Sequence, residues 1–68
     1  MVRNRFLEIR LRLGYRKQKE FAEFIGVTQA LYNKYENNTS QPGLDTLLKI
    51  SKKLDIKIDD IVYLEDSN

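Results

Sequence analysis

The segment of residues 21–38, FAEFIGVTQALYNKYENN, constrains the fold more than any other part of the chain. Apolar residues recur at helical spacing on both sides of Gly26, so the segment predicts two short helices joined by a tight turn. A small side chain at Ala22 and none at Gly26 are expected to let the helix backbones approach where they cross, while Val27 fills the junction. The second helix should then project from the domain with its N-terminal end forward.

Thr28 is predicted to cap that second helix, because its hydroxyl can accept a hydrogen bond from the free amides of the first turn. Tyr32 and Tyr35 stand at helical spacing, which favours burial in the core over stacking against the bases of a single strand. The remaining positions of this helix are predicted to face outward, namely Gln29, Ala30, Leu31, Asn33 and Lys34.

The rest of the chain also shows helical periodicity. Helices are predicted at about 4–13, 18–25, 28–36 and 44–54, with Gly14 in a left-handed conformation after the first and a loop over residues 37–43. The predicted buried stripes are Phe6, Ile9 and Leu13 in the first helix, and Leu44, Leu47, Leu48, Ile50 and Leu54 in the last. The pattern at 58–62 fits either a short helix or a strand.

Composition excludes several classes of protein. The 68 residues contain no cysteine and no histidine, which removes disulfides, thiol nucleophiles, imidazole bases and the usual zinc ligands. We therefore expect one domain, 1–68, with no enzymatic activity, no cofactor, no metal and no small-molecule substrate. Adjacent Asp59 and Asp60 are interpreted as first-turn helix charges rather than as a catalytic pair. No apolar run approaches the roughly 20 residues that span a bilayer, so a cytoplasmic protein without membrane contact is expected.

Charge is distributed unevenly. Residues 1–20 contain seven Lys and Arg and two Glu, a net +5, whereas residues 57–68 carry a net −3. On charge alone, the basic third is compatible with a solvated helix face and with a surface that faces phosphates.

The chain resembles the phage-repressor/XRE family of helix-turn-helix regulators from about Asn4 to Val62. The resemblance is carried by Arg10 with Gly14, QKEFAEFIGV at 18–27, Thr28, Tyr35-Glu36-Asn37, Pro42, LDTLLKISKKLDI at 44–56 and IDDIV at 58–62. It implies an all-α fold, a compact five-helix bundle of the lambda-repressor-like DNA-binding type, with a helix at 58–62. A short terminal β-pairing is a further option, because Val2, Val62 and Leu64 are apolar and belong to no predicted helical stripe. Two residues depart from the family pattern: Lys17 replaces a capping Ser or Thr, and Asn38 replaces a Gly.

The resemblance implies sequence-specific binding of double-stranded DNA by a transcriptional regulator, expected to be a repressor. Base contacts in the major groove are expected from Gln29, Ala30, Leu31, Asn33 and Lys34. Phosphate contacts are expected from Gln18, Thr28, Asn38, Thr39, Arg16, Lys17 and Lys19. Arg10 and Glu36 match the family positions of an ion pair that joins the first and third helices.

One short helix reads only a few base pairs, so a homodimer on a palindromic operator is expected. Two locations are predicted for its interface: the apolar faces of the last two helices, or the chain ends, where residues 1–3 could pair as strands with Val62, Tyr63 and Leu64, and Val2 is a further apolar candidate. The alternative function is a protein-binding module, such as an antitoxin or an anti-repressor. The acidic tail and the outward Leu31 are compatible with that alternative.

Overall fold

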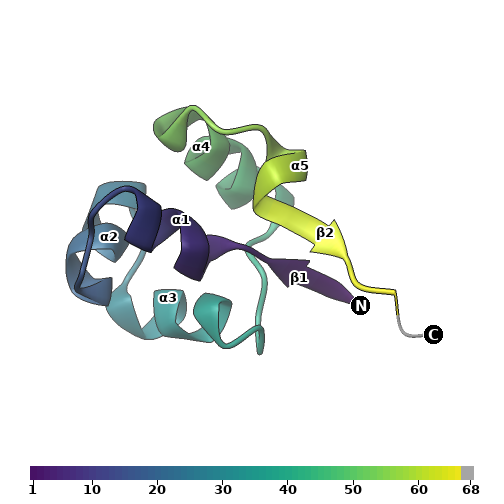
Figure 1. The fold of residues 1–68 in the computed structure, drawn as a ribbon, viewed down its shortest axis with the longest axis horizontal. Helices are drawn as coiled ribbons and strands as arrows, with labels where there is room; N and C mark the ends of the chain where they lie inside the picture. The colour runs from purple at the N-terminus through teal and green to yellow at the C-terminus, as the bar shows by residue number, and fades with distance from the viewer. Residues whose placement is uncertain (67–68) are drawn as a thin grey trace.

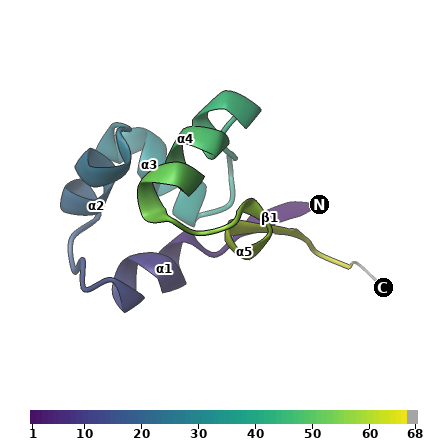
Figure 2. The same cartoon turned by 90° about the horizontal axis from the view of Figure 1, so that it is seen from above.

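A computed structural model of the chain describes residues 1–66, which form five helices and one two-stranded antiparallel sheet. In chain order the elements are β1 (Val2–Asn4), α1 (Phe6–Arg12), α2 (Gln18–Ile25), α3 (Gln29–Glu36), α4 (Leu44–Leu54), α5 (Ile58–Ile61) and β2 (Val62–Leu64). In Figure 1, α1 crosses the front of the molecule, with α3 below it and α4 and α5 above it. Seen from above in Figure 2, α2 lies at the end of the molecule opposite the strands. The five-helix fold expected from the resemblance is therefore confirmed.

Each helix contributes one large, fully buried side chain to a single core: Phe6, Phe21, Tyr32, Ile50 and Ile61. The aromatic rings pack against one another, with Phe21 edge-on to Tyr32 at 5.4 Å between ring centroids. The prediction that Tyr32 and Tyr35 lie in the core is correct, since they are 0% and 3% exposed. A chain this small buries only a modest core, so the loss of any one helix would expose much of it.

The glycines that follow α1 and α2 adopt backbone angles that other residues disfavour. Gly14 and Gly26 have φ of +89° and +87°, the left-handed region that side chains with a Cβ disfavour. The expectation that Gly26 is needed for a close approach of two backbones is wrong, because a Cβ built there meets no atom within 4 Å. Its positive φ, which ends α2 and turns the chain toward α3, is the reason for the glycine.

The first helix begins later than predicted, at Phe6 instead of about residue 4, because Asn4 belongs to β1. The Asn4 side chain instead accepts a hydrogen bond from the Phe6 amide (Oδ1 to N, 3.0 Å) at the start of α1. Leu13 is 46% exposed rather than buried, since α1 ends at Arg12 and Leu13 takes the capping position after it.

In α4, the predicted buried stripe is only partly correct. Leu47 and Ile50 are buried, whereas Leu44 and Leu48 are 71% and 45% exposed. The two exposed leucines are four residues apart and share the flank of the helix, beside the narrower face that packs on the core.

The chain ends pair within one molecule. β1 and β2 are antiparallel, with Val2 opposite Leu64, Arg3 opposite Tyr63 and Asn4 opposite Val62. We call these six residues the terminal ribbon. The short terminal β-pairing is thus present, but it uses both ends of the same chain, and Val62 lies in β2 rather than in the last helix. Arg3 and Glu65 form an ion pair beside it.

Within residues 1–66, none of the helices is both long and apolar enough to cross a lipid bilayer.

Candidate nucleic-acid interface

The outer side of α3 is an exposed helical surface that directly follows the tight turn. Burial of Tyr32 and Tyr35 fixes the rotation of this helix, so the five residues predicted to face outward are all exposed: Gln29, Ala30, Leu31, Asn33 and Lys34. Thr28 caps the helix as predicted, with its Oγ1 accepting from the Leu31 amide at 3.2 Å. The first turn of α3 is thereby held in a defined position at the surface.

Asn37 belongs to the same surface and was missed by the sequence reasoning. It is exposed and stands seven, four and three positions after Ala30, Asn33 and Lys34, so these four residues share one face of the helix. The sequence reasoning treated Asn37 as part of the helix ending. Its helical spacing from Ala30 and Asn33 was the signal that could have found it. We call these four residues the outer face of α3.

Arg10 and Glu36 form a nearly buried ion pair that joins α1 to α3. Arg10 Nε lies 2.6 Å from Glu36 Oε2 and Nη2 lies 3.4 Å from Oε1, and the two side chains are 9% and 8% exposed. Arg10 Nη1 also donates to the carbonyls of Tyr15 (3.0 Å) and Arg16 (2.7 Å). One guanidinium therefore holds both the C-terminal end of α3 and the loop that leads into α2.

Glu36 is an anion in this setting. Burial opposes its ionisation, but the hydrogen bond and positive charge of Arg10, together with hydrogen bonds from Tyr32 and Gln18, outweigh burial and lower the pKa of Glu36 below its usual value of 4.5. At neutral pH the carboxylate can therefore only accept hydrogen bonds.

Gln18, the first residue of α2, is directed toward α3. Its Nε2 donates to Glu36 Oε1 at 2.9 Å and to Asn33 Oδ1 at 3.2 Å. We call Arg10, Glu36, Gln18 and Asn33 the ionic network. Since an amide nitrogen has two hydrogens, both are used within the protein and neither is directed at a phosphate. As long as Gln18 keeps its hydrogen bonds to Glu36 and Asn33, only its backbone amide can make the expected contact with a phosphate.

The start of α2 has no side-chain cap, in agreement with Lys17 replacing the usual Ser or Thr. The amides of the first turn thus remain available to an anion, with the positive end of the helix dipole behind them. Three basic side chains around this helix start are exposed: Arg16, Lys17 and Lys19.

The loop after α3 is tied to β1 by side-chain amides. Asn38 has a positive φ of +57°, and its Oδ1 accepts from the Asn4 backbone amide and from Gln41 Nε2, both at 3.0 Å. Asn4 Nδ2 donates to the Tyr35 carbonyl at 2.7 Å and to Gln41 Oε1 at 2.8 Å. We call Asn4, Asn38 and Gln41 the amide cluster. Sequence reasoning missed Asn4 and Gln41, whose partners are distant in the chain.

This loop contains two residues predicted to contact phosphate. The oxygen of the Asn38 side chain points into the amide cluster, and the Thr39 hydroxyl donates to the Lys34 carbonyl at 3.2 Å. Both side chains thus also hold the shape of the loop.

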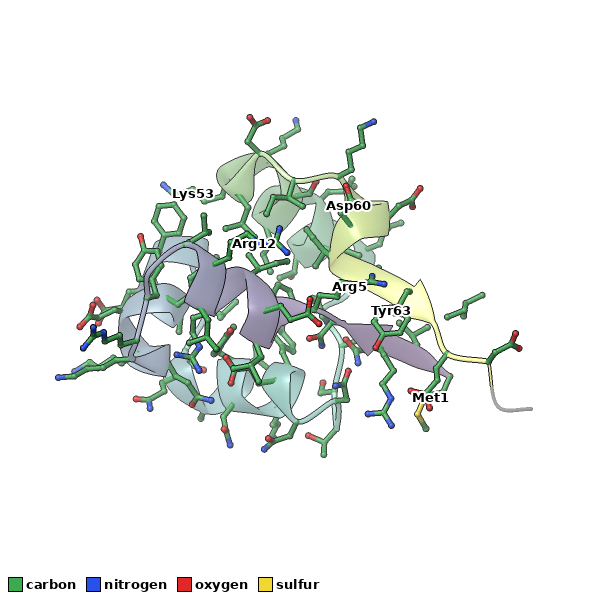
Figure 3. The ribbon with its side chains drawn as sticks, viewed as in Figure 1. Met1, Arg5, Arg12, Lys53, Asp60 and Tyr63 are labelled. Carbon is green, nitrogen blue, oxygen red and sulfur yellow. The ribbon has the colours of Figure 1, made fainter. Side chains whose placement is uncertain are left out.

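The four residues proposed for the dimer interface are in different environments. Val62 packs against the core. Tyr63 lies under the Arg5 guanidinium, 4.1 Å from the ring centroid, and Figure 3 shows the two side chains together beside the ribbon. Val2 and Leu64, directly opposite each other in the ribbon, remain 44% and 80% exposed.

The acidic residues of α5 are away from this surface. Asp59 and Asp60 are exposed, as expected for first-turn charges. Figure 3 shows Asp60 on the side of the molecule opposite α3. Residues 1–66 contain no cluster of three or more carboxylate, His or Cys side chains arranged to hold a metal ion.

An anchored, capped helix that follows a tight glycine turn and exposes a polar face defines a helix-turn-helix domain. The comparisons with known proteins agree, because the "Helix-turn-helix" family model matches residues 7–61. The chain belongs to the XRE-type helix-turn-helix family of DNA-binding transcriptional regulators.

Two relatives come from Bacillus subtilis (strain 168). The uncharacterised HTH-type transcriptional regulator YgzD is 34% identical over 67 residues, which cover 98% of this chain and all of YgzD. The SPbeta prophage-derived uncharacterised HTH-type transcriptional regulator YonR is 37% identical over 59 residues, covering 87% of this chain and 54% of YonR. The chain is also similar to the crystal structure of a candidate DNA-binding protein from Bacteroides fragilis, with a TM-score of 0.76, 25% identity, and coverage of 93% of this chain and all of the other.

Proposed function

We propose that this protein binds a specific sequence in double-stranded DNA as a homodimer, reads the major groove with α3 and represses transcription at that site. The observation that carries the proposal is the outer face of α3, which is polar, exposed and fixed in orientation by two buried tyrosines on the opposite side. The major groove of B-DNA is wide enough to admit an α-helix. Repression requires only that the bound protein occupy a site that the polymerase needs.

Direct base reading is assigned to α3. Gln29 can pair bidentately with adenine, and the methyl groups of Ala30 and Leu31 can contact thymine methyls. Asn33 and Lys34 lie one turn later and can reach bases or phosphates. Asn37 extends the same surface and joins them in the proposal.

Phosphate contacts are assigned to the two ends of this surface. At one end are the free amides at the start of α2, including that of Gln18, together with the exposed side chains of Arg16, Lys17 and Lys19. Near the α2–α3 turn and after α3, Thr28, Asn38 and Thr39 lie where their backbone or side chains could approach the sugar-phosphate backbone. Such contacts position the protein on the duplex without specifying its sequence.

The dimer is proposed to form through the terminal ribbon. Val2 and Leu64 form an exposed apolar pair on this ribbon, and a two-stranded sheet has open edges that can pair with a second copy. Sedimentation of the free protein and of its complex with a palindromic duplex tests this assignment. A monomer at tens of micromolar in both samples would refute it.

Selection of binding sites from a random pool of duplexes tests the central proposal. We expect enrichment of two inverted half-sites whose centres are about 10–10.5 base pairs, or a multiple of that, apart. If the dimer neutralises about 6–10 phosphates, its affinity should fall by about 10³- to 10⁵-fold between 50 and 200 mM salt. Absence of any enriched sequence, with binding that ignores salt, would favour a protein-binding module instead.

A further inference from the structure

We infer that Gln18 sets the base preference of Asn33, by holding the Asn33 side-chain amide with its oxygen toward α2 and its nitrogen toward the DNA. This inference rests on the proposed function, in which α3 reads the major groove. Gln18 is thus a specificity-determining residue that touches no base itself.

The first step is the orientation of the Gln18 amide. Glu36 is held by Arg10 through Nε at 2.6 Å, and its carboxylate oxygens can only accept hydrogen bonds. The Gln18 atom that lies 2.9 Å from Glu36 Oε1 must therefore be the amide nitrogen. The reverse orientation would place an amide oxygen against a buried carboxylate, so the ion pair excludes it.

The second step passes from Gln18 to Asn33. The same Nε2 lies 3.2 Å from Asn33 Oδ1 and donates its second hydrogen there. If the Asn33 amide were reversed, two NH2 groups would face each other with no acceptor between them. Glu36 thus fixes the orientation of the Gln18 amide, and Gln18 in turn fixes the orientation of the Asn33 amide. It leaves the Asn33 nitrogen on the outer side of an exposed position of α3.

The third step is the chemistry offered to the groove. A free asparagine can pair bidentately with adenine, because it presents an acceptor to N6 and a donor to N7. With its oxygen turned toward Gln18, Asn33 presents its amide nitrogen, a donor, to the groove. Guanine offers this donor two neighbouring acceptors, N7 and O6, whereas adenine offers N7 beside the N6 donor and thymine offers O4 alone. Asn33 is therefore expected to select a G·C pair over an A·T pair.

The experiment is a binding-site selection from a random duplex pool with four full-length proteins. The wild type gives the preferred site, and Asn33→Ala identifies the base pair that Asn33 reads. Gln18→Met is the test, because methionine is similar in length but has no amide. Lys19→Met is the matched control, since it removes a charge from the same helical turn without touching the ionic network. Circular dichroism of each variant verifies that it is folded.

We expect a G·C pair at the position whose preference is lost in Asn33→Ala. Gln18→Met should change the preference at this same base pair by about fivefold or more and shift it toward A·T, because the Asn33 oxygen is released for bidentate pairing with adenine. Lys19→Met should weaken all sequences alike and leave this base preference unchanged.

Three results would overturn the inference while leaving DNA reading by α3 intact. These are an A·T pair at the Asn33 position in the wild type, no base pair affected by Asn33→Ala, and uniform weakening of all sequences by Gln18→Met. If the wild type enriches no sequence, the proposed function fails and the inference fails with it.

A measurement on the free protein tests the arrangement without DNA. The side-chain amide hydrogens of Gln18 should exchange with water more slowly than those of Gln29, an exposed glutamine in the adjacent helix. The Asn33 side-chain hydrogens should exchange as fast as those of Gln29. Equal exchange for Gln18 and Gln29 by nuclear magnetic resonance would contradict the proposed hydrogen bonds.

Discussion

Two polar networks hold the C-terminal half of α3, and they differ in charge. The ionic network joins α3 to α1 and α2 through a nearly buried guanidinium and carboxylate. The amide cluster joins the end of α3 to β1 and to the following loop through neutral side chains. Both networks contact α3. The ionic network contacts it through the side chains of Asn33 and Glu36, and the amide cluster contacts its C-terminal end through the Tyr35 carbonyl.

The difference lies in what remains when one member is removed. Loss of one charge leaves its partner buried and uncompensated, which is strongly destabilising. Loss of one amide leaves unsatisfied neutral groups, whose cost is smaller. The ionic network should therefore dominate stability and respond to pH, whereas the amide cluster should do neither. The following predictions test this contrast.

The largest effect is expected for Glu36→Ala. It leaves the Arg10 guanidinium buried without its carboxylate, and should lower the free energy of unfolding by about 3–5 kcal/mol. That is comparable to the whole net stability of roughly 3–5 kcal/mol that a domain of this size attains. Urea unfolding followed by circular dichroism measures it. The double variant Arg10→Met with Glu36→Leu removes both charges and should recover most of the loss; equal destabilisation of both variants would contradict the role of the unpaired charge.

A smaller effect is expected for Asn4→Ala. It removes the partners of the Phe6 amide, the Tyr35 carbonyl and Gln41, and should lower the free energy of unfolding by about 1–3 kcal/mol. Asn37→Ala is the matched control, an exposed asparagine at the end of α3 whose loss should change stability by less than about 0.5 kcal/mol. If the two variants unfold at the same urea concentration, the amide cluster contributes nothing.

The pH dependence should separate the two networks. The pKa of Glu36 in the folded protein is lower than its usual value of 4.5, so the stability it contributes is complete above pH 4.5 and is lost as pH falls through the folded pKa. Urea midpoints measured from pH 6 downward should therefore decline for the wild type and for Asn4→Ala. The decline should be weaker for Glu36→Gln. A parallel decline in all three proteins would assign the acid sensitivity to other carboxylates.

The smallest effect is expected where neither network acts, at the uncapped start of α2. Lys17 has extended backbone angles of φ −102° and ψ 136°, which suit a capping residue. Lys17→Thr should therefore raise the free energy of unfolding by about 0.5–1 kcal/mol. Lys17→Ala provides the comparison without a hydroxyl, and both changes should weaken DNA binding through the lost charge. Equal thermal stability of the two variants would show that the helix start gains nothing from a cap.

The first four helices were predictable because each follows a helical period that can be seen in a short stretch of sequence, whereas α5 was expected only from the family resemblance. α2 and α4 have the predicted bounds, and α3 begins one residue after Thr28 as its cap requires. The same helical period predicted that Ala30, Asn33 and Lys34 face outward, and it missed only Asn37 of the outer face of α3. These features depend on residues within a few positions of one another.

Apart from the Arg10–Glu36 ion pair, which the family resemblance implied, the polar contacts between distant residues were not predicted. Asn4 donates to groups 31 and 37 positions away, and no local pattern marks such a partner. Gln18 at a helix start was interpreted as a phosphate ligand, and only the folded chain places Glu36 within 2.9 Å of its nitrogen. The pairing of the two chain ends was expected between copies, because sequence does not distinguish strand pairing within a chain from pairing between chains.

The terminal ribbon also has a consequence for how the protein folds. Its paired residues are 58 to 62 positions apart, so closing it orders almost the whole chain. Contacts across such long loops have a high entropic cost, and they stabilise the chain only after shorter-range contacts have formed. The helix pairs should therefore form in the folding transition state and the ribbon after it. Substitutions in the ribbon should then speed unfolding while leaving the rate of folding almost unchanged.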